Sequence, residues 1–88
     1  MSCTVRIASP LRSYTGGAAV VSANGESVTD VLADLERRFP GMRFRMIDEQ
    51  DRMRRHVRFF VNGEATFDLG LAVTRTDEVC IVQALSGG

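Results

Sequence analysis

A single amphipathic helix, set between short segments that alternate like β-strands, is the feature that most limits how this sequence can fold. Apolar residues recur at helical spacing between residues 28 and 39. They form one stripe, made of Val28, Val31, Leu32, Leu35 and Phe39. Ser27 and Asp30 have the spacing of a capping box, and Pro40-Gly41 is a stop signal. The sequence therefore predicts one helix that begins after Ser27.

Charged residues occupy the second half of this predicted helix. They lie mostly off the apolar stripe and comprise Asp34, Glu36, Arg37 and Arg38. The acidic residues come early and the arginines late, an order that suits the helix dipole. This order of charges supports the helix prediction.

Two alternating segments before the helix predict a β-hairpin. Residues 3–8 alternate with a period of two, as half-buried strands do. Pro10 ends this strand, and residues 14–17 supply a turn. Residues 18–23 then form the returning strand.

Three further strands are predicted after the helix. Residues 56–61 resume the alternation, and Asn62-Gly63 directly after them is a strong signal for a two-residue hairpin. Residues 64–67 then form a short edge strand, and residues 79–83 form the last strand.

The segment between the helix and the third strand, residues 42–55, has a weaker pattern. Phe44 and Ile47 are interpreted as the anchors of a short helix. The acidic block at residues 48–51 and the arginine-rich block at residues 52–55 predict a solvated, mobile loop of undetermined role.

This order of elements predicts an α+β domain. A helical crossover lets the first and last strands lie side by side and parallel in a mixed sheet, with the one main helix packed across it. The arrangement is similar to the β-grasp fold of ubiquitin. With 88 residues the chain suits a single domain with a thin core, which we place at residues 1–83, followed by a tail at residues 84–88.

Composition excludes several classes of function. The 11 basic and 11 acidic residues give a net charge of zero, so we expect no nucleic-acid binding. Every basic residue is Arg, which we attribute to the base composition of the genome, and no Lys is available for an isopeptide bond. No signal peptide or membrane-length apolar run is visible, so we expect a cytoplasmic protein that does not bind or span a membrane.

The tail holds the strongest candidate for chemistry, Gly87-Gly88. Taken alone, two terminal glycines are equally well explained as a frayed end or part of an expression scar. Behind a β-grasp domain they fit a narrow channel into a partner's active site, because glycine has no side chain. They also leave the terminal carboxylate unhindered.

Over its whole length the chain resembles the ubiquitin-like sulfur carriers: the molybdopterin synthase small subunit, the thiamin-pathway carrier and the cysteine-biosynthesis carriers. The matching residues are the helix start at 27–32, the hairpin at 61–64 and the stretch at 77–79. Its length and the segment before His56 most resemble the cysteine-biosynthesis type. Thr76 departs from the usual Gly, and the ending Ala84-Leu85-Ser86 departs from the commoner Val-Ala.

The resemblance implies a carrier and not an enzyme. An adenylyltransferase of the ubiquitin-activating type would transfer AMP from ATP to the Gly88 carboxylate, and a sulfur donor would convert the acyl-adenylate to a thiocarboxylate. A sulfur-accepting synthase for cysteine, a thiosugar, molybdopterin or thiamin would take the sulfur. A metalloprotease-type processing enzyme is a further implied partner. The carrier itself would bind no cofactor and be a monomer when free.

Strand parity predicts where partners dock. If Val57 and Phe59 face the helix, Arg58, Phe60 and Val82 face outward. We interpret these three as a partner-binding surface. The tail residues Ala84, Leu85 and Ser86 extend the same surface. An equally good alternative is that an additional loop covers Phe60.

Other readings stay open or carry less weight. Cys3, Cys80 and His56 match no metal-site spacing, so we expect no metal, and parity places the two thiols on opposite faces of the sheet. The chain could instead be a protein modifier, joined through Gly88 to lysines of its targets. It could also be an inert β-grasp binding module with an incidental tail.

Overall fold

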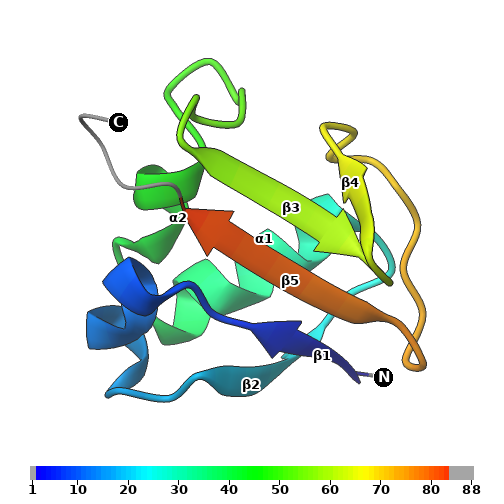
Figure 1. Cartoon of the computed structure of the whole chain (residues 1–88), viewed down its shortest axis with the longest axis horizontal. Helices are drawn as coiled ribbons and strands as arrows, with labels where there is room; N and C mark the ends of the chain where they lie inside the picture. Colours follow the sequence, from blue (N-terminus) through cyan, green and yellow to red (C-terminus); the bar gives the residue numbers. More distant parts are fainter. Residues whose placement is uncertain (1, 84–88) are drawn as a thin grey trace.

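The computed structural model describes residues 2–83, which form one sheet with helices on one side (Figure 1). The five strands are β1 (Ser2–Arg6), β2 (Val20–Asn24), β3 (Val57–Val61), β4 (Glu64–Thr66) and β5 (Glu78–Gln83). The helices are α1 (Val28–Arg38), the short α2 (Met42–Met46) and a 3₁₀ helix, η1 (Ser9–Thr15).

The strands are ordered β2-β1-β5-β3-β4, so the first and last strands of the chain are neighbours in the sheet. β1 and β5 are parallel, with Val5 opposite Val79, and all other pairs are antiparallel. Helix α1 crosses one face of this sheet (Figure 1). The predicted mixed sheet with one main helix is confirmed.

The core lies between that face of the sheet and the helices. Alternate residues of the strands face the helices, and the side chains of Val5, Phe59 and Ile81 are among those buried there. They pack in one cluster with the stripe residues Leu32 and Leu35 of α1. Burial of this kind stabilises a fold by about 25 cal/mol for each Å² of apolar surface.

The connection between β1 and β2 differs from the predicted turn. It contains η1, whose Leu11 is fully buried and whose Pro10 occupies the first helical turn. Proline suits that position because its fixed φ is helical and its missing N–H would have no partner there. Gly16, with a φ of 67°, ends the element.

The start of α1 is capped as predicted, with one difference. Ser27 Oγ accepts a hydrogen bond from the backbone N–H of Asp30 at 3.2 Å. The Asp30 carboxylate accepts from the N–H of Glu26 at 3.1 Å and not from that of Ser27. The Ser27 side chain therefore satisfies one free donor of the first turn, and the Asp30 side chain satisfies the N–H just before the N-cap.

Asp34 lies off the apolar stripe of α1 and is nevertheless buried. Its side chain is only 5% exposed, although it belongs to the charged set of α1. Asp34 Oδ2 accepts a hydrogen bond from the backbone N–H of Asn24 at 3.0 Å, which ties the middle of α1 to the end of β2. Arg37 and Arg38 form ion pairs with the same carboxylate.

Residues 42–55 form a short helix and an exposed loop, but the predicted helix anchor is only half right. Met42, Met46 and Ile47 are buried, whereas Phe44 is 57% exposed. In the loop, the Asp48 carboxylate accepts hydrogen bonds from the N–H groups of two following residues at 2.9 and 3.0 Å. The exposure of the loop is confirmed, and hydrogen bonds within the loop order it as a turn.

The hairpin at Asn62-Gly63 is confirmed, with φ values of 51° and 86°. Both values lie in the left-handed region that a two-residue turn of this type requires. Asn62 also bonds to the segment before β5: Nδ2 donates to Asp77 Oδ1 at 2.7 Å, and Oδ1 accepts from Glu78 N–H at 2.9 Å. These bonds hold the end of β3 against the start of β5.

Candidate functional site

The residues predicted to carry the chemistry, Gly87 and Gly88, lie outside the described residues. The same holds for the predicted contact residues Ala84, Leu85 and Ser86. The described chain ends with Gln83, the last residue of the central strand β5. Gln83 pairs with Val57 at the start of β3.

The sheet face opposite α1 carries the three described residues of the predicted contact surface. Phe60 is opposite Cys80, Cys80 is opposite Arg6, and Val82 is opposite Arg58. None of the described helices crosses this face, and Figure 1 shows all of them on the other side or at its edges. The strand register thus brings the predicted contact residues together.

Two further apolar residues belong to this face and were not predicted. Val20 of β2 is opposite Arg6 and is 46% exposed, and Phe67, just after β4, is 66% exposed. The alternation of residues 18–23 could have indicated that Val20 lies on this face. We name the set Arg6, Val20, Arg58, Phe60, Phe67, Cys80 and Val82 the open sheet face.

The exposed residues of the open sheet face are mainly apolar, with two arginines held in place. Arg6 Nε lies 3.0 Å from Glu78 Oε1. The Arg58 guanidinium donates to the carbonyl oxygens of Arg55 and Val57 at 2.6 and 2.8 Å and lies 5.3 Å from the centre of the Phe67 ring. Val82 is 42% exposed and Phe60 is half-buried. Exposed apolar surface with arginine at its border is typical of a protein-binding surface.

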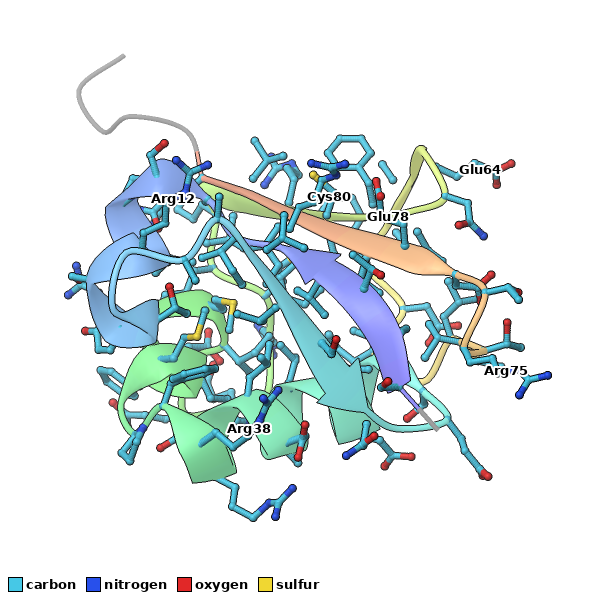
Figure 2. All side chains as sticks on the ribbon, turned by 90° about the horizontal axis from the view of Figure 1, so that it is seen from below. Arg12, Arg38, Glu64, Arg75, Glu78 and Cys80 are labelled. Atoms are coloured by element: carbon cyan, nitrogen blue, oxygen red, sulfur yellow. The ribbon has the colours of Figure 1, made fainter. Side chains whose placement is uncertain are left out.

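The two cysteines lie on opposite faces of the sheet, as parity predicted, and both are free thiols. Cys3 is buried in the core, and its removal from water raises the pKa of the thiol. Cys80 is half-buried on the open sheet face (Figure 2). The buried thiol is therefore protonated and unreactive at neutral pH.

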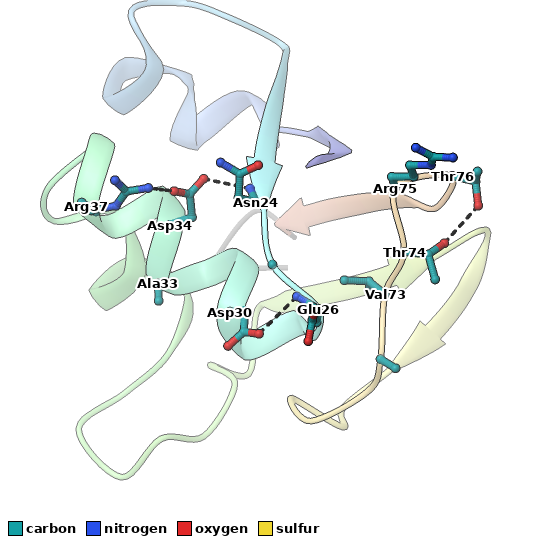
Figure 3. A pocket seen from close by; sticks show the side chains of 12 residues that line it. Asn24, Glu26, Asp30, Ala33, Asp34, Arg37, Val73, Thr74, Arg75 and Thr76 are labelled. Carbon is teal, nitrogen blue, oxygen red and sulfur yellow. Dashed lines mark hydrogen bonds and ion pairs between the residues drawn. The ribbon is translucent and has the colours of Figure 1, made fainter. Parts of the chain in front are cut away.

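A broad depression lies between α1 and residues 72–76, on the far side of the sheet from the open sheet face (Figure 3). Its polar groups mostly bond to each other: Asp34 to Asn24, Asp30 to Glu26, and Thr74 to Thr76. The expected catalytic and contact residues do not line it. We interpret it as a consequence of how the 72–76 segment crosses the start of α1.

No metal site or membrane span is found in the part of the chain that the structure describes. Residues 2–83 contain no cluster of three or more His, Cys, Asp or Glu side chains that could hold a metal ion. His56 is exposed at the start of β3. No described helix is long and apolar enough to cross a bilayer.

Comparison with known sequences identifies relatives along the whole chain. A sequence model of the ThiS family matches residues 5–88. The sulfur carrier protein CysO of Mycobacterium tuberculosis is 38% identical over 93 aligned residues, which cover 100% of both chains.

Solved structures give the same result. The crystal structure of a BexX/CysO complex from Amycolatopsis orientalis matches with a TM-score of 0.89 and 32% identity, over 98% of this chain and 99% of that one. SAMP1 from Haloferax volcanii matches with a TM-score of 0.84 and 25% identity over 100% of both chains. The predicted β-grasp fold is therefore confirmed.

These comparisons also confirm the expectation of a carrier and not an enzyme, because proteins of this kind are small carriers. The predicted resemblance to ubiquitin-like sulfur carriers is confirmed over the full length. The chain belongs to the ThiS family.

Proposed function

We propose that this protein carries sulfur on its C-terminal carboxylate. In this proposal an activating enzyme adenylates Gly88, a sulfur donor displaces AMP, and the resulting thiocarboxylate gives its sulfur to a biosynthetic enzyme. The observation that carries the proposal is the full-length likeness to the sulfur carrier protein CysO, at 38% identity. The residues Gly87-Gly88 support it, because two glycines without side chains would leave a carboxylate at Gly88 unhindered.

The chemistry needs activation by another protein. A free carboxylate is a poor electrophile, and transfer of AMP from ATP converts it to an acyl-adenylate while pyrophosphate leaves. A sulfur nucleophile then attacks the acyl carbon, and AMP leaves with the electron pair of the broken C–O bond. The described residues offer no enclosed site with a nucleophile and a base for these steps. The proposal therefore places them in the partner's active site.

In this proposal the folded domain serves as the surface that the partner enzyme recognises. The open sheet face continues into the end of β5, and the tail follows directly after Gln83. A partner that binds Arg58, Phe60 and Val82 would receive residues 84–88 beside that contact. Ala84, Leu85 and Ser86 would then contact the entrance of its active site.

Among the possible sulfur acceptors we favour an enzyme of cysteine biosynthesis. The support is the likeness to the sulfur carrier protein CysO at 38% identity, and the structural match to the BexX/CysO complex. The acceptors for thiosugar, molybdopterin and thiamin are the remaining alternatives.

An ATP–pyrophosphate exchange assay with the activating enzyme of the same organism tests the proposal. The full chain should support exchange, and a chain without Gly87 and Gly88 should not. The matched control is Gly70→Ala, which changes a glycine of the β4–β5 connection and leaves the tail intact. Equal exchange with and without the two glycines would favour the inert binding module and refute the proposal.

A second candidate function is protein modification through the same glycine. The likeness to SAMP1, whose name denotes a small archaeal modifier protein, supports it. The chain lacks lysine, so any adduct through a lysine would be on another protein. A covalent conjugate that depends on Gly88, found on a second protein, would favour this function over sulfur transfer.

A further inference from the structure

An arginine-rich segment lies at the end of the sheet where β5 finishes, and the proposed function does not account for it. Residues 43–58 hold six of the 11 arginines, namely Arg43, Arg45, Arg52, Arg54, Arg55 and Arg58. The same residues include only three acidic side chains, Asp48, Glu49 and Asp51. The segment is thus strongly basic in a chain whose net charge is zero.

The strand register places part of this segment beside the end of β5. Val57, the first residue of β3, is opposite Gln83, the last described residue. Arg54 and Arg55 lie just before β3 in the chain, three and two residues before Val57. On the other side of β5, Arg12 of η1 lines a depression together with Gln83. We name Arg12, Arg54 and Arg55 the basic rim.

Acidic side chains lie toward the end of the molecule away from the basic rim, where Arg75 also lies (Figure 2). Figure 2 shows Arg12 at the end where β5 finishes, whereas Glu64 and Glu78 lie toward the other end. Asp77 also lies at that other end, in the turn before β5. The basic rim is therefore a local feature around the exit of the chain from the sheet.

Carbonyl groups orient two of the rim arginines without neutralising them. Arg12 Nε donates to the carbonyl oxygen of Ile7 at 3.1 Å, and Arg54 Nε donates to that of Phe44 at 2.7 Å. The Arg54 guanidinium also lies 4.6 Å from the centre of the Phe44 ring. Such contacts hold a guanidinium in place while its full positive charge remains available to a ligand.

No carboxylate among residues 2–83 pairs with the basic rim. The ion pairs in this part of the chain join Arg6, Arg37, Arg38 and Arg43 to their partners, and Arg55 is exposed. Asp51 pairs with Arg43. Asp48 accepts hydrogen bonds from backbone N–H groups, and these bonds, together with the charges of Arg54 and Arg52, hold its pKa below the usual value without an ion pair to either arginine. Arg12 and Arg55 thus keep positive charges without an ion pair in the described residues, which favours an anionic binding partner.

We propose that the basic rim binds an acidic protein surface beside the site where the activating enzyme receives the tail. The inference rests on the proposed function, since it assigns the rim to the same encounter. Opposite charges on two proteins speed their association and orient them before contact. The rim would in this way direct the chain end to the partner's active site, and the open sheet face would supply the apolar contact.

Charge reversal at Arg55, with Arg75 as the matched control, tests the proposal. Both side chains are exposed, neither forms an ion pair within residues 2–83, and both reversals change the net charge equally. Arg75 lies at the end of the molecule away from Arg12 (Figure 2). Association with the activating enzyme of the same organism is followed by stopped-flow fluorescence at low and high salt.

We expect Arg55→Glu to slow association about tenfold at low salt and to approach the wild-type rate at high salt. Arg75→Glu should stay within about twofold of wild type at both. Arg12→Gln, on the other side of β5, should slow association less than Arg55→Glu does, because it removes a charge without reversing it. Equal rates for Arg55→Glu and Arg75→Glu would overturn the proposal.

Failure of the rim and failure of the proposed function give different results. If the enzyme adenylates the wild-type chain and Arg55→Glu associates as fast as Arg75→Glu, the rim proposal alone is wrong. If the enzyme does not adenylate the wild-type chain at all, both are wrong.

Discussion

Replacing Asp34 with Ala is expected to lower the free energy of unfolding by about 2 kcal/mol, because a buried charged acceptor is lost. The structure assigns most of this loss to one bond, the 3.0 Å contact from Asn24 N–H to Asp34 Oδ2. The ion pairs with Arg37 and Arg38 add little, because those two side chains are 71% and 39% exposed. For a chain of this length, the loss corresponds to a fall in melting temperature of about 10 °C.

Thermal unfolding followed by circular dichroism measures the effect, with two comparison variants. Asp34→Asn keeps an acceptor for Asn24 N–H and should cost about 1 kcal/mol. Arg37→Ala removes only an exposed partner and should cost less than about 0.5 kcal/mol. An Asp34→Ala protein within about 0.5 kcal/mol of wild type would show that the bond from Asn24 N–H contributes little, and an equal loss for Arg37→Ala would assign the stabilisation to the ion pair instead.

The pH dependence of the same variant provides a second check. The bond from Asn24 N–H, followed by the charges of Arg37 and Arg38, holds the pKa of Asp34 below its usual value. A lowered folded-state pKa means that the stabilisation is complete above the unfolded pKa of about 3.9 and is lost as the pH falls through the folded value. The difference between wild type and Asp34→Ala should therefore be largest near neutral pH and shrink in acid.

Three further substitutions test other parts of the structure. Gly63→Ala should destabilise the fold by about 1 kcal/mol in urea unfolding, because Gly63 has a φ of 86° and no neighbour within 4 Å, so that only backbone strain acts; an unchanged midpoint would contradict the assigned turn. Met46→Ala should cost about 3 kcal/mol because Met46 is fully buried, whereas Phe44→Ala should cost less than about 1 kcal/mol. The reverse order would show that α2 packs by its other face. Val82→Asp should raise the KM for adenylation about tenfold, in the range of a contact worth 1.4 kcal/mol, without lowering the melting temperature. An unchanged KM would exclude this part of the open sheet face from the contact.

The strand order and the turn at Asn62-Gly63 were predictable because their signals are local. Alternation along five or six residues identifies a strand and its buried side, and Asn-Gly has few other conformations as favourable as a tight hairpin turn. The outward positions of Arg58, Phe60 and Val82 followed from the same parity. The resemblance to sulfur carriers then needed only these elements and the ending Gly87-Gly88.

The features that sequence reasoning missed depend on tertiary contacts. Asp34 is buried because the end of β2 passes over it, and helical spacing alone does not reveal that neighbour. The helix η1 contains one buried apolar residue, Leu11, which is too few to produce a periodic pattern. In α2 the spacing did contain the signal, because Met42 and Met46 are four residues apart on one face and Phe44 lies on the opposite face.

Conversion of the Gly88 carboxylate to a thiocarboxylate can be followed by intact mass spectrometry, after incubation of the purified chain with the activating enzyme of its own organism, ATP and a sulfide source. We expect a mass gain equal to the replacement of one oxygen by one sulfur, and no gain for the chain that lacks Gly88. An unchanged mass for the full chain, with no acyl-adenylate formed, would refute the proposed function.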